Sequence, residues 1–365
     1  MRAWQQPANI TLVLGRRDEP TDGVYDYCGS LTTACQSLGS SVHALQVRWL
    51  EGGWLRASLR LVRNLQMRVP CWVVVQVTHL AWSRHGFPFG LLMVALAARF
   101  SGARVAAIIH DPLGFPGDRL ILRVKRASQH LTLRFMRQVT SHMFVTLPPA
   151  QIPWIGNGRN GDITFLPVGS NIPVNGKNGA APTDRRFTVV VFGVTEGSCG
   201  ITERRTVTTT LERVAEVVGP VVLWAFGRGT DPTQGAWSHP SREVEIHSLG
   251  IVDEPTASNV LAEADAMLFL RGSISSRRTS AIAGLAHGLP VVGYRGLETG
   301  WPVTEAGVVL VDPGDVDGLA AALVRVATDP SHRNDLRARS SDAYLRYFAW
   351  DVIARAFLET LASAR

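Results

Sequence analysis

The 365-residue sequence has few of the features that assign a chain to a simple functional class. Its four cysteines form no C-x-x-C pair and share no zinc-ligand spacing with histidines, which indicates reduced cytosolic thiols rather than a disulfide framework or a zinc site. Walker, H-E-x-x-H and G-x-S-x-G elements are missing, and no G-x-G-x-x-G follows the first predicted strand, where Gly15–Gly23 lacks that spacing. The longest apolar run, Phe87–Ala98, is too short to cross a bilayer and predicts a buried helix beside a sheet.

Lysine is also scarce, and the basic charge is unevenly distributed. Residues 1–180 hold 19 basic and 8 acidic residues, net +11, and the remainder holds 18 and 22, net −4, which together give the net charge of +7. Trp54–Arg68 and Arg119–Arg137 carry much of the excess as basic amphipathic segments. This pattern is typical of contact with an anionic membrane surface, although a solvated helix face in an arginine-rich protein gives it too. Nucleic-acid binding is not indicated, because no recognised binding motif is present.

Apolar segments of strand length alternate with longer helical patterns, which predicts an α/β architecture with parallel sheets in two domains. We expect a first domain at 1–173, a Gly/Asn/Pro-rich linker at 174–186, a second domain at 187–345 and a terminal helical segment at 346–365. Met1–Pro7 is polar and leads directly into a strand, so we expect no signal peptide and a cytoplasmic location. The predicted strands are Ile10–Leu14, Val42–Val47, Trp72–Val77, Val105–Ile109, Met143–Thr146, Ile163–Leu166, Thr188–Phe192, Val221–Phe226, Glu245–Ser248, Met267–Leu270, Val291–Tyr294 and Val308–Val311.

The segment that follows the predicted strand Met267–Leu270 has the composition of an anion site. A loop of hydroxyl residues and two arginines leads into a predicted helix, Thr279–His287. Free backbone N–H groups and the positive end of the helix dipole attract anions, and guanidinium groups match phosphate oxygens. We expect a nucleotide diphosphate to bind there. The residues expected to contact it are Ser275, Ser276, Arg277, Arg278, Thr279 and Ser280.

Several motifs, in order along the chain, resemble those of retaining glycosyltransferases with the GT-B fold, of the glycosyltransferase family 4 type. G-L-A-H-G-L-P-V-V and V-D-P-G-D-V-D-G-L resemble segments of that family's second domain. T-D-G-V-Y-D-Y, I-I-H-D, L-P-V-G-S-N-I-P and a late F-A-W add further matches. The resemblance implies two Rossmann-like domains facing each other across a cleft, a nucleotide-sugar donor on the second domain, and a final helix that packs back toward the first domain.

The resemblance also implies roles for single residues. Asp22 and Gly23 match a glycine loop near the acceptor, although a plain strand-to-helix turn would have the same composition. His110 matches a histidine beside the donor sugar. Asp111 would accept a hydrogen bond from an acceptor hydroxyl or cap the turn before Pro112.

In the second domain, glycines that follow strands permit close approach to the nucleotide. Gly227 lies in one such loop, and the segment from Gly250 to Val252 resembles the one whose backbone meets the nucleobase. The sequence departs from the family at a spaced pair of glutamates that usually contacts the donor, because Ser275 and Ala283 occupy those places. The donor is therefore in doubt, and a catalytically idle protein remains open.

Asp315-Val316-Asp317 is a D-x-D that binds metal in other glycosyltransferases, but here it opens a helix, and we interpret it as a cap. We expect no metal and no cofactor beyond the nucleotide sugar. The sequence thus predicts transfer of a sugar from a nucleotide-diphosphate sugar to a hydroxyl acceptor, such as a lipid-linked or surface saccharide. The alternatives are a non-catalytic partner of a glycosyltransferase complex and, with less support, a nicotinamide-dependent dehydrogenase.

Overall fold

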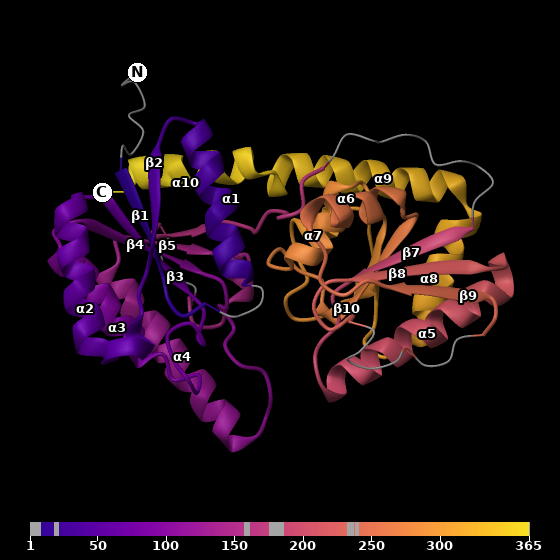
Figure 1. Ribbon diagram of the computed structural model, residues 1–365, viewed down its shortest axis with the longest axis horizontal. Coiled ribbons are helices and arrows are strands. Elements are labelled where there is room, and N and C mark those ends of the chain that lie inside the picture. Colours follow the sequence, from indigo (N-terminus) through magenta and orange to yellow (C-terminus); the bar gives the residue numbers. More distant parts are fainter. Residues whose placement is uncertain are drawn as a thin grey trace. The chain divides into compact units, whose positions relative to one another are not determined.

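The structure is a computed structural model that describes residues 9–17, 22–156, 161–174, 186–231, 237 and 241–364. The chain divides into two compact units (Figure 1). Unit 1 comprises Met1–Val168 together with Trp350–Arg365, and unit 2 comprises Gly169–Ala349. Except for residues 174 and 186, the predicted linker lies outside the described residues.

Unit 1 is built on a six-stranded sheet in which every neighbouring pair is parallel. The strand order is β2-β1-β3-β4-β5-β6. Central strands such as β3 are buried along their whole length and, except for Gln76, β3 is apolar, because helices cover both faces of a parallel sheet. The strands are β1 (Asn9–Leu14), β2 (Ser41–Gln46), β3 (Trp72–Val77), β4 (Arg104–Ile109), β5 (His142–Val145) and β6 (Ile163–Phe165).

Two groups of helices pack on the sheet of unit 1. Helices α2 (Trp49–Arg68), α3 (Phe89–Phe100) and α4 (Leu120–Val139) lie side by side, with α3 in the middle (Figure 1). Their buried side chains, such as Leu61, Val94 and Leu133, share a core with the sheet. Helix α1 (Gly23–Ser37) packs against α10 (Trp350–Ser363), although more than 300 residues separate them in the chain.

Unit 2 also contains a six-stranded parallel sheet, in the order β12-β11-β10-β7-β8-β9. Helices α5 and α8 pack together over a core that includes Leu211, Leu223, Leu268 and Leu323. The strands are β7 (Phe187–Phe192), β8 (Val221–Phe226), β9 (Val244–Ser248), β10 (Ala266–Ser273), β11 (Val291–Tyr294) and β12 (Val308–Val311). The helices are α5 (Ser198–Val218), α6 (Glu254–Glu263), α7 (Thr279–Ala286), α8 (Val316–Thr328) and α9 (Pro330–Ala343), followed by a π-helical turn, Tyr344–Phe348.

Each sheet has one place where the strand order reverses. In unit 1 this switch point lies between β1 and β3, and in unit 2 it lies between β7 and β10. Crossover helices leave in opposite directions from such a point, so the carboxyl ends of its two strands border a crevice that no helix fills. The predicted α/β class with two parallel sheets is confirmed, and these two crevices are the places to look for ligand sites.

Among the described residues, no helix is long and apolar enough to traverse a lipid bilayer.

The contact of α10 with the sheet of unit 1 gives a test of the division into units. Phe357 is fully buried, and its ring centroid lies 5.1 Å from that of Phe144 in β5. We expect Phe357→Ala to lower the free energy of unfolding by about 3–5 kcal/mol, because it leaves a cavity in the core. Urea unfolding followed by circular dichroism measures this. Glu359→Ala, on the exposed side of α10, should change it by less than about 0.5 kcal/mol, and equal effects of the two substitutions would contradict the packing described.

Candidate functional site

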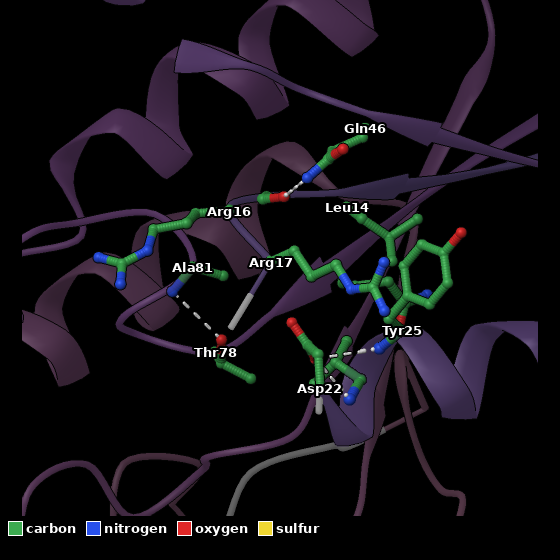
Figure 2. Close-up of a pocket in the computed structure, with 11 residues that line it drawn as sticks. Leu14, Arg16, Arg17, Asp22, Tyr25, Gln46, Thr78 and Ala81 are labelled. Carbon is green, nitrogen blue, oxygen red and sulfur yellow. Dashed lines mark hydrogen bonds between the residues drawn. The ribbon is translucent and has the colours of Figure 1, made fainter. Parts of the chain in front are cut away.

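The switch point of unit 1 holds an open pocket with about 320 Å³ of empty space (Figure 2). It is bordered by residues at the carboxyl ends of β1, β2 and β3. The close approach of two loops shapes it, because a Cβ on Gly15 would lie 2.5 Å from the carbonyl oxygen of Ala81. The Arg16 amide donates to that same oxygen over 2.9 Å. The lining residues are Leu14, Gly15, Arg16, Arg17, Asp22, Val24, Tyr25, Gln46, Gln76, Thr78 and Ala81.

The predicted acceptor-side residues border this pocket. Asp22 lines it and caps α1, because its Oδ1 accepts hydrogen bonds from the amides of Val24 and Tyr25 at 2.9 and 3.1 Å. Gly23 is the first residue of that helix. The Arg17 guanidinium carbon lies 4.5 Å from the centroid of the Tyr25 ring, a cation–π contact (Figure 2). In the same view the Arg16 guanidinium extends to the other side of the pocket.

The predicted catalytic residues, His110 and Asp111, lie at the carboxyl end of β4, next to the switch point. His110 is 8% exposed, and its Nε2 lies 2.9 Å from Oε1 of Gln76, a residue that lines the pocket. The Asp111 carbonyl oxygen lies 3.0 Å from Nε2 of His79. Gln76 therefore links His110 to the pocket, a connection that the sequence did not suggest.

In unit 2 a pair of arginines lies at the switch point. Arg271 is in β10, and a Cβ on Gly193, which follows β7 with φ +77°, would lie 2.8 Å from its Nη1. Its guanidinium makes no hydrogen bond or ion pair with any residue that the structure describes. Burial lowers the pKa of Arg271, and the neighbouring charge of Arg228 lowers it further, against the opposing effect of Glu203. The two guanidinium groups form a cationic place where an anion could bind, although the charges of Glu203 and Glu196 act in the opposite direction.

The amino end of α5 opens beside these arginines. Its N-cap residue is Gly197, so no side chain occupies the free amides of the first turn. The preceding loop is held by Glu203, which accepts from the Thr195 amide at 2.8 Å and from its hydroxyl at 2.6 Å. Arg204, in the second turn of α5, is 7% exposed and donates to the Gly229 carbonyl oxygen at 3.1 Å.

The loop predicted to hold the diphosphate is tied to a glutamate that sequence reasoning missed. Glu298, which follows β11, accepts from Nε of Arg277 at 2.9 Å, from Nη2 of Arg277 at 2.5 Å and from the Ser275 hydroxyl at 3.2 Å. Nη2 of Arg278 lies 3.3 Å from the same carboxylate. Ser275 and Ser276 are buried, whereas Thr279 and Ser280, in the first turn of α7, are partly exposed. One carboxylate thus offsets part of the two positive charges.

Burial raises the pKa of the Glu298 carboxyl, but the hydrogen bond and charge of Arg277 and the charge of Arg278 outweigh it, so the pKa lies below its ordinary value. Arg278 also borders the arginine pair, because its Nη2 would lie 3.3 Å from a Cβ on Gly272, the neighbour of Arg271. The two cationic groups are therefore parts of one surface at the carboxyl end of β10.

The remaining predicted donor residues lie in adjoining loops. Gly227 follows β8 and donates its amide to the Gly250 carbonyl oxygen at 2.7 Å, and Val252 lies two residues beyond, partly exposed. In the D-x-D, Asp315 caps α8 by accepting from the Gly318 amide at 2.8 Å, as predicted. Asp317 pairs with Arg213. Among the described residues, no group of three or more His, Cys, Asp or Glu side chains has the arrangement of a metal site.

Arg271 and Arg228 were not predicted as site residues, although their positions in the sequence indicate such a role. Arg271 directly follows the apolar run Met267–Leu270, and Arg228 lies between the glycines of the F-G-R-G turn. A cation at the carboxyl end of a predicted parallel strand is a stronger indication than one further along the loop. Glu298 had no such signal, because only the fold brings it to Ser275.

No protein-family model matches the chain, and no curated protein matches its sequence. Solved structures do match its fold. A glycosyltransferase from Rickettsia africae aligns over 98% of both chains with a TM-score of 0.69 and 12% identity. HepE from Anabaena, in complex with UDP and glucose, aligns over 97% of this chain and 99% of its own, with a TM-score of 0.64 and 13% identity.

A Listeria monocytogenes protein assigned as a UDP-N-acetylglucosamine 2-epimerase aligns over 97% of this chain and 95% of its own, with a TM-score of 0.62 and 10% identity. The chain has the GT-B fold. Fold alone does not choose between these activities, because unrelated chemistries share one scaffold. The choice depends on the residues described above.

The Glu298 cluster predicts a pH-dependent contribution to stability. Because its folded-state pKa lies below the unfolded value of about 4.3, the stabilisation is fully present above that pH and is lost as the pH falls through the folded-state pKa. We expect Glu298→Gln to lower the free energy of unfolding by about 1–3 kcal/mol at pH 7, and by less at pH 3.5. Urea titrations at both pH values measure this, with the exposed Glu216→Gln as control. A difference that does not depend on pH would rule out the ionised cluster.

Proposed function

We propose that the protein is a glycosyltransferase that moves a sugar from a nucleotide-diphosphate sugar to a hydroxyl acceptor. The observation that carries the proposal is the Arg271 guanidinium, which is largely buried beside Arg228 at the switch point of unit 2 and has no partner among the described residues. A diphosphate fits this place because it supplies two negatively charged groups to adjacent cations and to the free amides of α5.

In the proposed complex the phosphates lie between Arg271 and the amino end of α7. Thr279 and Ser280 offer hydroxyl donors, and Arg277 and Arg278 remain in reach with their planes fixed by Glu298. The loop that joins Gly227 to Gly250, with Val252, would approach the nucleoside. This assignment keeps Arg277, Arg278, Thr279 and Ser280 from the sequence prediction, leaves out the buried Ser275 and Ser276, and adds Arg271 and Arg228 as the principal cations.

In the proposed reaction the bond between the anomeric carbon and the β-phosphate oxygen breaks, and the acceptor oxygen bonds to that carbon as its proton leaves. Charge develops on the departing diphosphate, where fixed cations and amides stabilise the transition state without rearranging. In this proposal His110 lies beside the donor sugar, as the resemblance implies, and Asp111 accepts a hydrogen bond from the acceptor hydroxyl. The resemblance to retaining enzymes suggests retention of configuration, and no metal is required where arginines balance the charge.

Two alternatives differ in what they predict. An epimerase would also bind a nucleotide sugar, but it would change the sugar without an acceptor. A non-catalytic partner would have no use for a buried, unsatisfied cation, because leaving such a group unpaired destabilises the fold. The described arginines at the switch point favour a working site.

We further propose that unit 1 rests on an anionic membrane surface. Helix α3, predicted as fully buried, exposes one edge, with Phe89 at 55% and Phe100 at 78%. It lies between the basic helices α2 and α4, which expose residues such as Leu55 at 68% and Leu120 at 76%. Acidic side chains are nearly missing from these helices, since α3 and α4 have none and α2 has only Glu51. Apolar side chains among arginines suit a lipid surface and, with it, a lipid-linked acceptor.

A nucleotide panel tests the donor site. We expect one of UDP, GDP and ADP to raise the melting temperature, since a ligand at 100 times its Kd stabilises by about 2.7 kcal/mol. NAD should have no effect. Arg271→Ala should remove the stabilisation, and the double variant Arg277→Ala/Arg278→Ala should weaken it, whereas Arg205→Ala, on the exposed side of α5, should leave it intact.

Transfer is then followed as release of the nucleoside diphosphate from the donor that stabilises the protein, with and without a mixture of saccharide acceptors. Acceptor-dependent release supports the proposal. Conversion of the sugar without acceptor, seen by proton NMR, would identify an epimerase, and binding of no nucleotide at all would contradict the proposed function.

The membrane proposal predicts binding to vesicles that contain phosphatidylglycerol and none to pure phosphatidylcholine vesicles. Arg56→Glu/Arg123→Glu should weaken binding at least about tenfold, because each basic residue near the surface contributes about 1 kcal/mol. Arg325→Glu/Arg355→Glu changes the charge equally on other exposed helix faces and should bind as the parent does. Co-sedimentation measures this, and an equal loss for both pairs would show that net charge, not this face, matters.

A further inference from the structure

The pocket at the switch point of unit 1 is lined by two arginines, whereas a neutral ligand would need no positive charge. Arg16 and Arg17 both line it, and both are exposed. Neither guanidinium forms a hydrogen bond or an ion pair with a residue that the structure describes. Most exposed arginines can turn into water, but the contact of Arg17 with the Tyr25 ring, 4.5 Å from its centroid, fixes the plane of its guanidinium. Such stacking leaves the N–H groups at the edge of the guanidinium plane available to donate hydrogen bonds to a ligand.

Among the described residues that line the pocket, Asp22 is the one acidic residue, and it forms no direct ion pair with these arginines. Its carboxylate is directed at the amino end of α1, where it accepts from the amides of Val24 and Tyr25. It is the stabilising cap of that helix, so it cannot turn to the arginines without exposing two amides. The described lining residues therefore carry an excess of positive charge.

A buried donor in the same pocket is also unsatisfied. Gln76 is 1% exposed, and its Oε1 is engaged by Nε2 of His110. Its Nε2 is buried and has no hydrogen-bond partner among the described residues. A buried amide that makes no hydrogen bond is costly, so such a group points to a ligand that completes it.

We propose that this pocket binds an oxyanion carried by the acceptor, a phosphate or a carboxylate, through Arg16, Arg17 and Gln76. That the oxyanion belongs to the acceptor rests on the proposed function. The binding of an oxyanion in this pocket does not depend on it. An oxyanion has several lone pairs that can accept hydrogen bonds from two planar guanidinium groups and one amide. A neutral saccharide hydroxyl has too few lone pairs to do this. Since Gln76 also contacts His110, the bound anion places the rest of the acceptor next to the predicted catalytic histidine.

The test measures binding to the full chain by calorimetry with three probes: glucose 6-phosphate, glucuronate and glucose. We expect one or both anionic probes to bind and glucose to bind at least about tenfold more weakly, since hydrogen bonds to charged groups contribute about 1.5–3 kcal/mol each. Preference for the phosphate or for the carboxylate distinguishes the two kinds of acceptor. Arg17→Ala should reduce binding of the anionic probe by a similar factor, and Arg17→Lys should restore only part of it.

Two control variants locate the effect. Arg271→Ala, at the proposed donor site, should leave binding of the anionic probe unchanged, which excludes that site as its location. Arg99→Ala removes the same charge at the end of α3, toward the amino edge of the sheet, and should also have no effect. Equal affinity for all three probes, or loss in Arg271→Ala but not in Arg17→Ala, would overturn the inference. If the anionic probes bind but no nucleotide does, the proposed function fails while the anion site stands.

Discussion

The reversal of strand order within each parallel sheet is the constraint on which the two candidate sites depend. Right-handed crossovers carry helices to one face on one side of the reversal and to the other face beyond it. The carboxyl ends of β1 and β3, and those of β7 and β10, are left uncovered as a result. Glycines then let the loops approach closely, as at Gly15 against Ala81 and at Gly193 against Arg271.

The arginines near the switch point of unit 2 differ in what holds their side chains in position. Arg277 and Arg278 share Glu298, which fixes their planes and removes part of their charge. Arg271 is held by burial against a glycine, with its charge uncompensated by a direct contact. In the proposed site, the arginines held by Glu298 would orient a bound ligand, and Arg271 would supply most of the attraction.

Much of the fold follows from the sequence. The run Val221–Phe226 is apolar throughout and Trp72–Val77 is apolar except for Gln76, which is typical of buried parallel strands, and the structure places strands there. The site follows less well. His110 was predictable because it directly follows a predicted strand, and Asp22 because it lies in the T-D-G-V-Y-D-Y motif, but Gln76 lies inside a strand and Glu298 comes from the next loop. Their roles arise from contacts between residues 21 to 34 positions apart, which spacing along the chain does not reveal. The exposed edge of α3 was missed because its sequence is apolar all round, so periodicity could not show which face the sheet would leave uncovered.

The placement of α10 in unit 1 has a consequence for synthesis on the ribosome. Helix α10 covers Phe144 and packs against α1, so unit 1 lacks one of its own elements until the residues that follow unit 2 have been synthesised. Unit 2 is contiguous from Gly169 to Ala349 and is complete earlier. Although the strands of unit 1 emerge first, its core can be completed only after all of unit 2 has been made, and Phe144 stays uncovered until α10 arrives.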